Sequence, residues 1–290
     1  MERQVSLDEI SDGRLYGLND MVKADCGDCK GCSACCRGMG DSIVLDPMDI
    51  FRLCGGLHRT FEELLQDCLE LRVADGIILP NLKMERASGS CLFLDDDGRC
   101  SIHPVRPGIC RIFPLGRVYE DHSFRYFLQI HECRKEVRTK VKVKKWIDTP
   151  DAAVYDQYIT DWHYFLKELQ RHMEEAQENA QMAEKGEAEK TVRDETQEAV
   201  QPEEQKTVQD ETQEAVQGET QKADQDETQK AVQGETQVAK QHETWAGFLK
   251  KTICMAVLKE FYMTPYDGNR EFYPQFYERL ERQKEHLLSL

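Results

Sequence analysis

The chain has 290 residues, which predicts one or two domains. Its 38 lysines and arginines stand against 54 aspartates and glutamates, a formal net charge of -16 that argues against nucleic acid as a partner, because phosphate contacts need a basic surface. No apolar run approaches the ~18 residues that span a bilayer, and the first residues lack the apolar core of a secretory signal. We therefore expect a cytoplasmic protein without a membrane segment, in which twelve cysteines indicate metal binding or redox chemistry.

The first half of the chain contains two helix starts and one turn. Asp46-Pro47 predicts a helix that begins at the proline. Thr60 and Glu63 form a capping-box pattern ahead of a helix over 64–72. Asp97-Gly98 is a tight-turn signal and predicts a hairpin whose strands cover 91–95 and 99–103.

The second half of the chain is richer in helix. A second hairpin is predicted from strands at 117–120 and 124–130, and Thr149-Pro150 begins a long helix that reaches residue 169. A last helix is expected over 272–288. We therefore predict a small α+β fold, helix-majority, with two β-hairpins and an irregular cysteine-rich metal-binding core. Between the two helices lies one more segment whose apolar residues have helical spacing: Phe248, Ile253, Val257, Leu258 and Phe261.

An acidic repeat of eight residues separates the two parts of the predicted fold. It runs from 194 to 241, reads DETQEAVQ in its first copy, and holds 13 acidic and four basic residues. Eight residues turn an α-helix by ~80° beyond two full turns, so the apolar positions form no continuous face. We predict a disordered insertion over 173–242, with a solvated helix as the alternative, in a single cysteine-cluster domain made of 1–172 plus 243–290. The insertion is expected to be a linker, with partner binding as the alternative.

Residues 26–36 read CGDCKGCSACC and place five thiols within eleven residues. A gap of two residues lets both sulfurs of a tight turn face one ion, as in zinc and iron–sulfur sites. One tetrahedral zinc takes four ligands, so five thiols indicate either a shared second site or one spare thiol. The spacing of bacterial ferredoxins also fits, although Arg37 stands where proline is usual and no second ferredoxin half follows.

A second group of cysteines follows downstream. Cys91 and Cys100 bracket the first predicted hairpin, so their thiols can approach one site; Cys110 and Cys133 come later. Two histidines beside this group are candidate nitrogen ligands, although a lone histidine is more often structural. The remaining cysteines lie in helical patterns and are expected to be core thiols. The two histidines are His103 and His131, and the expected core thiols are Cys54, Cys68 and Cys254.

Taken together, CKGCSACCR at 29–37, LDPMDIFRL at 45–53 and CLFLDDDGRCSIHPVRPGICRIFP at 91–114 resemble the YkgJ-type CxxCxxCC family. That family is described as a zinc- or iron-chelating domain and includes flagellin lysine N-methylases, for which an iron–sulfur cluster and S-adenosylmethionine are implied. The resemblance covers about 25–135. It implies these metal ligands: Cys29, Cys32, Cys35, Cys36, Cys91, Cys100, Cys110 and Cys133, with Cys26 outside the core motif. It also implies cofactor-binding donors near the sulfurs: Arg37, Arg106 and Arg111.

Three functions remain open from the sequence. The first is a protein that binds an iron–sulfur cluster or iron, or else zinc, and delivers, stores or senses it. The second is a cluster-dependent protein lysine N-methylase, which would need S-adenosylmethionine and a protein substrate; no glycine-rich nucleotide fingerprint or Walker loop is present, so Arg106 and Arg111 are its only visible anchors. The third is a structural zinc module. We rank iron–sulfur or iron above zinc, because eight or nine cysteines exceed one structural zinc site.

Overall fold

The computed structural model describes residues 6–27, 32–135, 137–198 and 247–287. The chain divides into two compact units, Met1–Gln170 with Thr252–Leu290, and Arg171–Lys251. Most of the acidic repeat, from 199 to 241, lies outside the described residues, while 173–198 continue a helix. The predicted domain boundaries therefore stay a prediction. None of the helices in the described ranges is long and apolar enough to cross a membrane.

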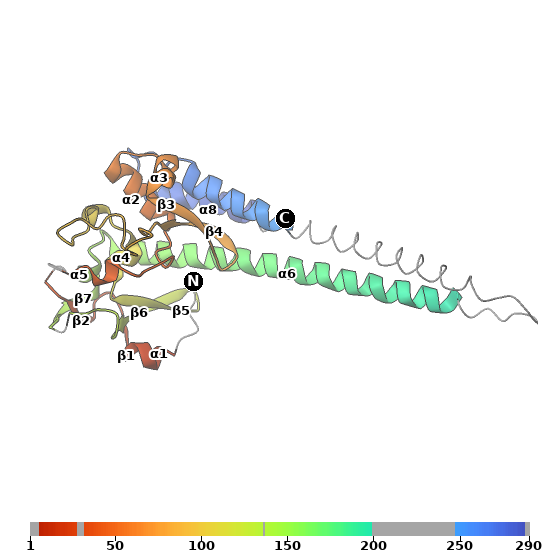
Figure 1. Cartoon of the computed structure of the whole chain (residues 1–290), viewed down its shortest axis with the longest axis horizontal. Helices are drawn as coiled ribbons and strands as arrows, with labels where there is room; N and C mark the ends of the chain where they lie inside the picture. The colour runs from red at the N-terminus through yellow and green to blue at the C-terminus, as the bar shows by residue number, and fades with distance from the viewer. Residues whose placement is uncertain (1–5, 28–31, 136, 199–246, 288–290) are drawn as a thin grey trace, which may run out of the picture. The chain divides into compact units, whose positions relative to one another are not determined.

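The fold is mixed α+β with three small antiparallel sheets, as predicted (Figure 1). The first unit begins with α1 (Leu7–Ile10). A three-stranded sheet has the order β1-β6-β5, and the other two sheets are pairs, β2 with β7 and β3 with β4. The strands are β1 (Ser11–Tyr16), β2 (Met21–Asp25), β3 (Leu69–Ala74), β4 (Ile77–Leu82), β5 (Leu115–Glu120), β6 (Ser123–Gln129) and β7 (Thr139–Lys142).

Both predicted helix starts in the first half are confirmed. Helix α2 (Pro47–Leu57) follows Asp46, which forms a reciprocal capping box with Asp49. Helix α3 (Phe61–Asp67) starts at the capping box of Thr60 with Glu63. The expected extension of this second helix to residue 72 is wrong, because β3 pairs with β4 along its whole length and so buries Leu69 opposite Leu82.

The first predicted hairpin is also wrong as a pair of strands. Within 91–103 one bridge forms, between Leu94 and Cys100, around a tight turn in which the amide of Gly98 donates to the Asp95 carbonyl. Gly98 has a φ of 73°, which explains the glycine. The chain then enters the short helices η2 (His103–Val105) and α4 (Gly108–Ile112). The second predicted hairpin is confirmed as β5 with β6, in register from Leu115 opposite Leu128 to Glu120 opposite Ser123.

The core of the first unit joins the residues before 170 to those after 252. Helix α6 (Ala152–Glu198) carries Tyr158 and Trp162; the Trp162 ring lies 4.9 Å from Phe261, and Tyr158 lies 4.6 Å from Phe276. Residues 247–258 are helical, in line with the apolar spacing of this segment, and four of its five apolar residues are buried; the exception is Phe248, which is 67% exposed. The remaining elements are α5 (Val143–Ile147), η3 (Lys259–Met263), a single turn of π-helix, and α8 (Phe272–Leu287).

Candidate metal centre

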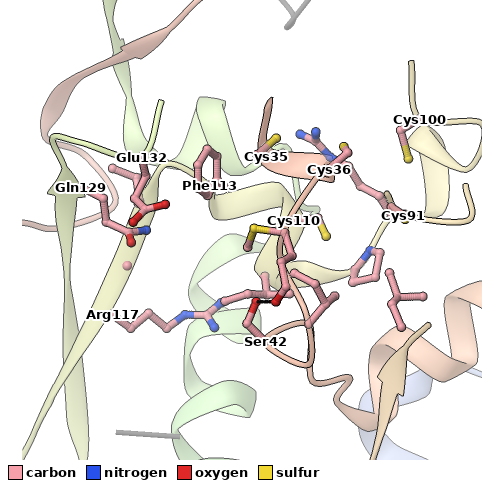
Figure 2. A pocket seen from close by; sticks show the side chains of 18 of the residues that line it. Cys35, Cys36, Ser42, Cys91, Cys100, Cys110, Phe113, Arg117, Gln129 and Glu132 are labelled. Atoms are coloured by element: carbon pink, nitrogen blue, oxygen red, sulfur yellow. Dashed lines mark hydrogen bonds between the residues drawn. The ribbon is translucent and has the colours of Figure 1, made fainter. Parts of the chain in front are cut away.

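Five of the predicted ligands line a single cavity of about 640 Å³ in the first unit. They come from three separate segments of the chain: the 3-10 turn η1 (Ala34–Cys36), the loop 91–100, and helix α4. Figure 2 shows their sulfurs around the upper part of the cavity. The five are Cys35, Cys36, Cys91, Cys100 and Cys110.

Backbone pairing brings the first two segments together. The amide of Cys91 donates to the carbonyl of Cys36 at 2.7 Å, and the amide of Gly38 donates to Gly89 at 2.8 Å. On the far side of the turn, the amide of Ser101 donates to Phe93 at 2.8 Å. These bonds hold Cys36 beside Cys91 and bring Cys100 back to the base of the same loop.

The third segment is positioned by a buried carboxylate. Asp49 on α2 is 1% exposed, and its Oδ1 accepts a hydrogen bond of 2.7 Å from the amide of Gly108, the first residue of α4. A Cβ at Gly108 would lie 2.0 Å from the hydroxyl oxygen of Tyr155 on α6, so only glycine fits where α4 approaches α6. Because Cys110 is on the first turn of α4, the hydrogen bond from Gly108 to Asp49 and the close packing of Gly108 on Tyr155 determine the position of its thiol.

The three predicted arginines have different surroundings. Arg106 lines the cavity, and its buried Nε has no hydrogen-bond partner in the part of the chain that the structure describes. Arg37 donates from Nε to Ser33 and from Nη1 to Ser90, which adds a side-chain link between the cysteine segments. Arg111 is buried and donates to the backbone carbonyls of Arg106, Asp148 and Pro104. Arg111 does not line the cavity, and its described hydrogen bonds all go to backbone carbonyls, which stabilises the local backbone conformation. A role for Arg111 in cofactor binding stays a prediction.

The thiol of Cys36 ionises more readily than those of Cys91, Cys100 and Cys110. A hydrogen bond with the Cys35 thiol lowers the pKa of Cys36 to about 7, and the Arg106 and Arg37 cations act in the same direction. Burial raises the pKa of the other three thiols that interact electrostatically with it: Cys91, Cys100 and Cys110. A bound cation reverses this burial effect, because a coordinating thiol loses its proton outright.

The thiols form a lining and not a closed coordination shell. Among the described residues, no three cysteine, histidine, aspartate or glutamate side chains converge on one point as ligands of a single ion. The chemistry of the donors nevertheless fits zinc or iron, since thiolates are soft ligands for both. Of the other predicted ligands, Cys26, Cys32 and Cys133 are described but do not line the cavity, and neither do His103 and His131; Cys29 lies outside the described residues.

Two residues that shape this region were missed in the sequence. The capping role of Asp49 could have been predicted, since it lies three residues after Asp46 and completes the capping box. Its hydrogen bond with the amide of Gly108 could not, because no sequence pattern links these two positions. Arg117 on β5 lines the cavity together with the thiols, and nothing in its own neighbourhood in the sequence marks it. The expected core thiols differ in burial: Cys254 is 1% exposed, whereas Cys54 and Cys68 are half-buried.

Neither the comparison with curated proteins nor that with solved structures gave a match. A scan against family models did give one. It begins just before the CxxCxxCC motif and ends one residue after Cys133, which takes in all five thiols of the cavity and their connecting loops. Residues 28–134 match the CxxCxxCC family, whose model is described as "Putative zinc- or iron-chelating domain", and the resemblance predicted from the motifs is confirmed.

Proposed function

We propose that this protein binds an iron–sulfur cluster, or iron, through the thiols of its cavity, with zinc as the alternative metal. The observation that carries the proposal is the meeting of five thiols from three chain segments on one cavity. Five thiols exceed the four ligands of one structural zinc, which favours a polynuclear centre. Cys29 and Cys32, in the matched motif, would complete the ligand set.

The residues around the thiols support a negatively charged centre. Arg106 and Arg37 already favour the thiolate of Cys36, and N–H donors near thiolate sulfurs tune the charge and potential of a cluster. When bound, the metal would supply redox or Lewis-acid chemistry at the cavity wall. The proposal includes a cytoplasmic location, where thiols stay reduced; no described cysteine forms a disulfide.

The test is metal analysis of protein purified without oxygen. We expect stoichiometric iron with sulfide, or zinc, and its loss when Cys36, Cys91 or Cys110 is replaced by serine. Cys54→Ser and Cys254→Ser are matched controls that should keep the metal, because neither thiol lines the cavity. One zinc and no iron would select the structural zinc module. A protein that folds fully and binds no metal would overturn the proposal.

A cluster-dependent N-methylase is the second candidate. It is favoured by one observation, that Arg106 and Phe113 line the cavity beside the thiols and could hold a charged, aromatic cosubstrate such as S-adenosylmethionine. Calorimetry on the metal-loaded protein tests this candidate. Binding that is lost in Arg106→Ala with the metal retained would favour the methylase, and the absence of heat at high excess of S-adenosylmethionine would leave the metal-binding function alone.

A further inference from the structure

The cavity is much larger than a metal site requires. Zinc–sulfur bonds of about 2.3 Å enclose a sphere of only ~50 Å³, whereas the cavity holds about 640 Å³. That volume is in the range of sites for small organic molecules. Most of the space beyond the thiols is bounded by apolar side chains, among them Ile43, Leu82, Ile102, Leu115 and Phe127.

Arg117 brings a half-buried cation to this apolar space. Figure 2 shows its side chain extending into the cavity from the side opposite Cys91 and Cys100. Its Nε is buried and has no hydrogen-bond partner among the described residues, and its Nη2 donates to the Tyr155 hydroxyl over a long 3.4 Å. The guanidinium also interacts with the Tyr119 hydroxyl and lies against aromatic rings, 5.2 Å from the centre of the Phe124 ring.

No carboxylate forms an ion pair with Arg117 within the described part of the chain. Two acidic groups of the described residues act on it electrostatically, Asp46 and Asp156. The Asp46 side chain accepts hydrogen bonds from the Asp49 amide and the Tyr158 hydroxyl, and Asp156 accepts one from the Tyr126 hydroxyl. A buried charge without a counter-charge is costly, and arginine can never discharge by losing its proton. An anion in the cavity would remove this cost, because the free Nε–H is a donor for a carboxylate oxygen.

The remaining charged groups of the lining fix where the anion lies. Arg106 is beside Cys36, at the thiol wall, whereas Glu132 and Gln129 lie above Arg117 on the same side of the cavity in Figure 2. Glu132 is exposed to solvent. We therefore place the anionic group at the guanidinium of Arg117, with its apolar part along the aliphatic walls. We propose that the cavity binds a small amphipathic carboxylate, whose headgroup pairs with Arg117 and whose hydrocarbon chain fills the space that leads to the thiols.

This inference goes beyond metal binding and does not depend on the identity of the metal. It also places the ligand's charged group at Arg117, whereas the methylase candidate depends on Arg106. Because metal content and ligand affinity are measured on the same samples, failure of one proposal can be told from failure of the other. A metal-free protein that still selects carboxylates would overturn only the proposed function, and a metal-loaded protein without that selectivity would overturn only this inference.

The first experiment needs no variant. Octanoate, 1-octanol and octylammonium have the same chain and differ in the headgroup, and their affinities are measured by calorimetry on anaerobically purified protein. We expect octanoate to bind at least tenfold more tightly than 1-octanol, and octylammonium most weakly. Affinity should also rise about threefold to fourfold per added methylene from butanoate to octanoate. Equal affinities for the three headgroups, or no dependence on chain length, would overturn the inference.

The second experiment locates the headgroup. Arg117→Met should abolish the preference of octanoate over 1-octanol, and Arg117→Lys, which keeps the charge, should retain most of it. Arg125→Met is the matched control, because Arg125 is exposed on β6, opposite Val118 of β5. If Arg117→Met does not fold, Arg117→Lys and the wild-type headgroup series still decide the question. A preference that persists unchanged in folded Arg117→Met would overturn the assignment.

Discussion

The carboxylate of Asp49 accepts a hydrogen bond from the amide of Gly108, and this bond ties α2 to the helix that carries Cys110. The other oxygen of Asp49 accepts the amide of Asp46, so one buried side chain both starts a helix and positions a thiol. The proposed metal ligands are therefore positioned in part by a contact that contains no cysteine, between Asp49 and Gly108. Two predictions test this contact between α2 and α4.

Gly108→Ala should destabilise the protein and reduce its metal content. The added methyl would meet the Tyr155 hydroxyl at 2.0 Å, and overpacking of this kind costs about 1–3 kcal/mol. The control is Gly55→Ala in α2, where no atom lies within 4 Å of the new Cβ and alanine favours the helix by about 1 kcal/mol. Thermal unfolding and metal analysis measure both effects. Equal stability of the two variants would show that α4 moves freely against Tyr155.

Asp49→Asn should lower stability by about 1–3 kcal/mol and weaken metal retention. An amide has one acceptor oxygen, so either the Gly108 amide or the Asp46 amide would lose its partner. Denaturant unfolding measures the loss, and Asp121→Asn, at an exposed turn, is the control. If Asp49→Asn unfolds at the wild-type midpoint with full metal content, the hydrogen bond from Gly108 to Asp49 does not position α4.

Thiol reactivity in protein stripped of metal should follow the pKa values. The pKa of Cys36 is about 7, lowered by Cys35, while burial raises those of Cys54 and Cys68 to about 11. At pH 8 Cys36 is mostly thiolate, whereas only about one Cys54 in a thousand is ionised. Iodoacetamide should therefore label Cys36 first, and its rate should fall tenfold per pH unit below about pH 6.

Mass spectrometry of digested protein gives the label at each cysteine. The rate at Cys54 should instead keep rising across the neutral and weakly alkaline range, because its pKa lies above that range. Protein loaded with metal is the second arm, in which Cys36 should be protected. Labelling of Cys54 as fast as Cys36 at pH 8 would contradict the prediction.

Deletion of residues 199–241, replaced by a short glycine-serine linker, should leave metal content and melting temperature nearly unchanged. The deleted segment has no aromatic residue and no cysteine, and loop-closure entropy depends only weakly on length. Phe261→Ala is the opposite case, since this buried ring packs on Trp162 and its loss should cost about 3–5 kcal/mol. A large drop in melting temperature on deletion would show that the repeat contributes to the folded structure.

The sequence by itself determined the features that depend on neighbours three or four residues away. Asp46-Pro47 and Thr60 with Glu63 mark helix starts, because proline at the first helical position and a capping box both act within one turn. The strands that flank Asp121-His122 pair through a short turn for the same reason, as β5 and β6 do. The spacing of the cysteines likewise indicated the resemblance to the CxxCxxCC family, whose model matches residues 28–134, since its motifs are short and occur in a fixed order.

Only the tertiary structure decided which of these groups meet. Asp49 and Gly108 are 59 residues apart, and no pattern along the chain shows that they touch. The strand β3 replaced an expected helical end because its partner β4 buries one face of it, a contact that local propensity does not contain. Arg117 came to face the thiols in the same way. Contacts between segments distant in the sequence depend on how whole elements pack, and the place of a cavity follows from that packing alone.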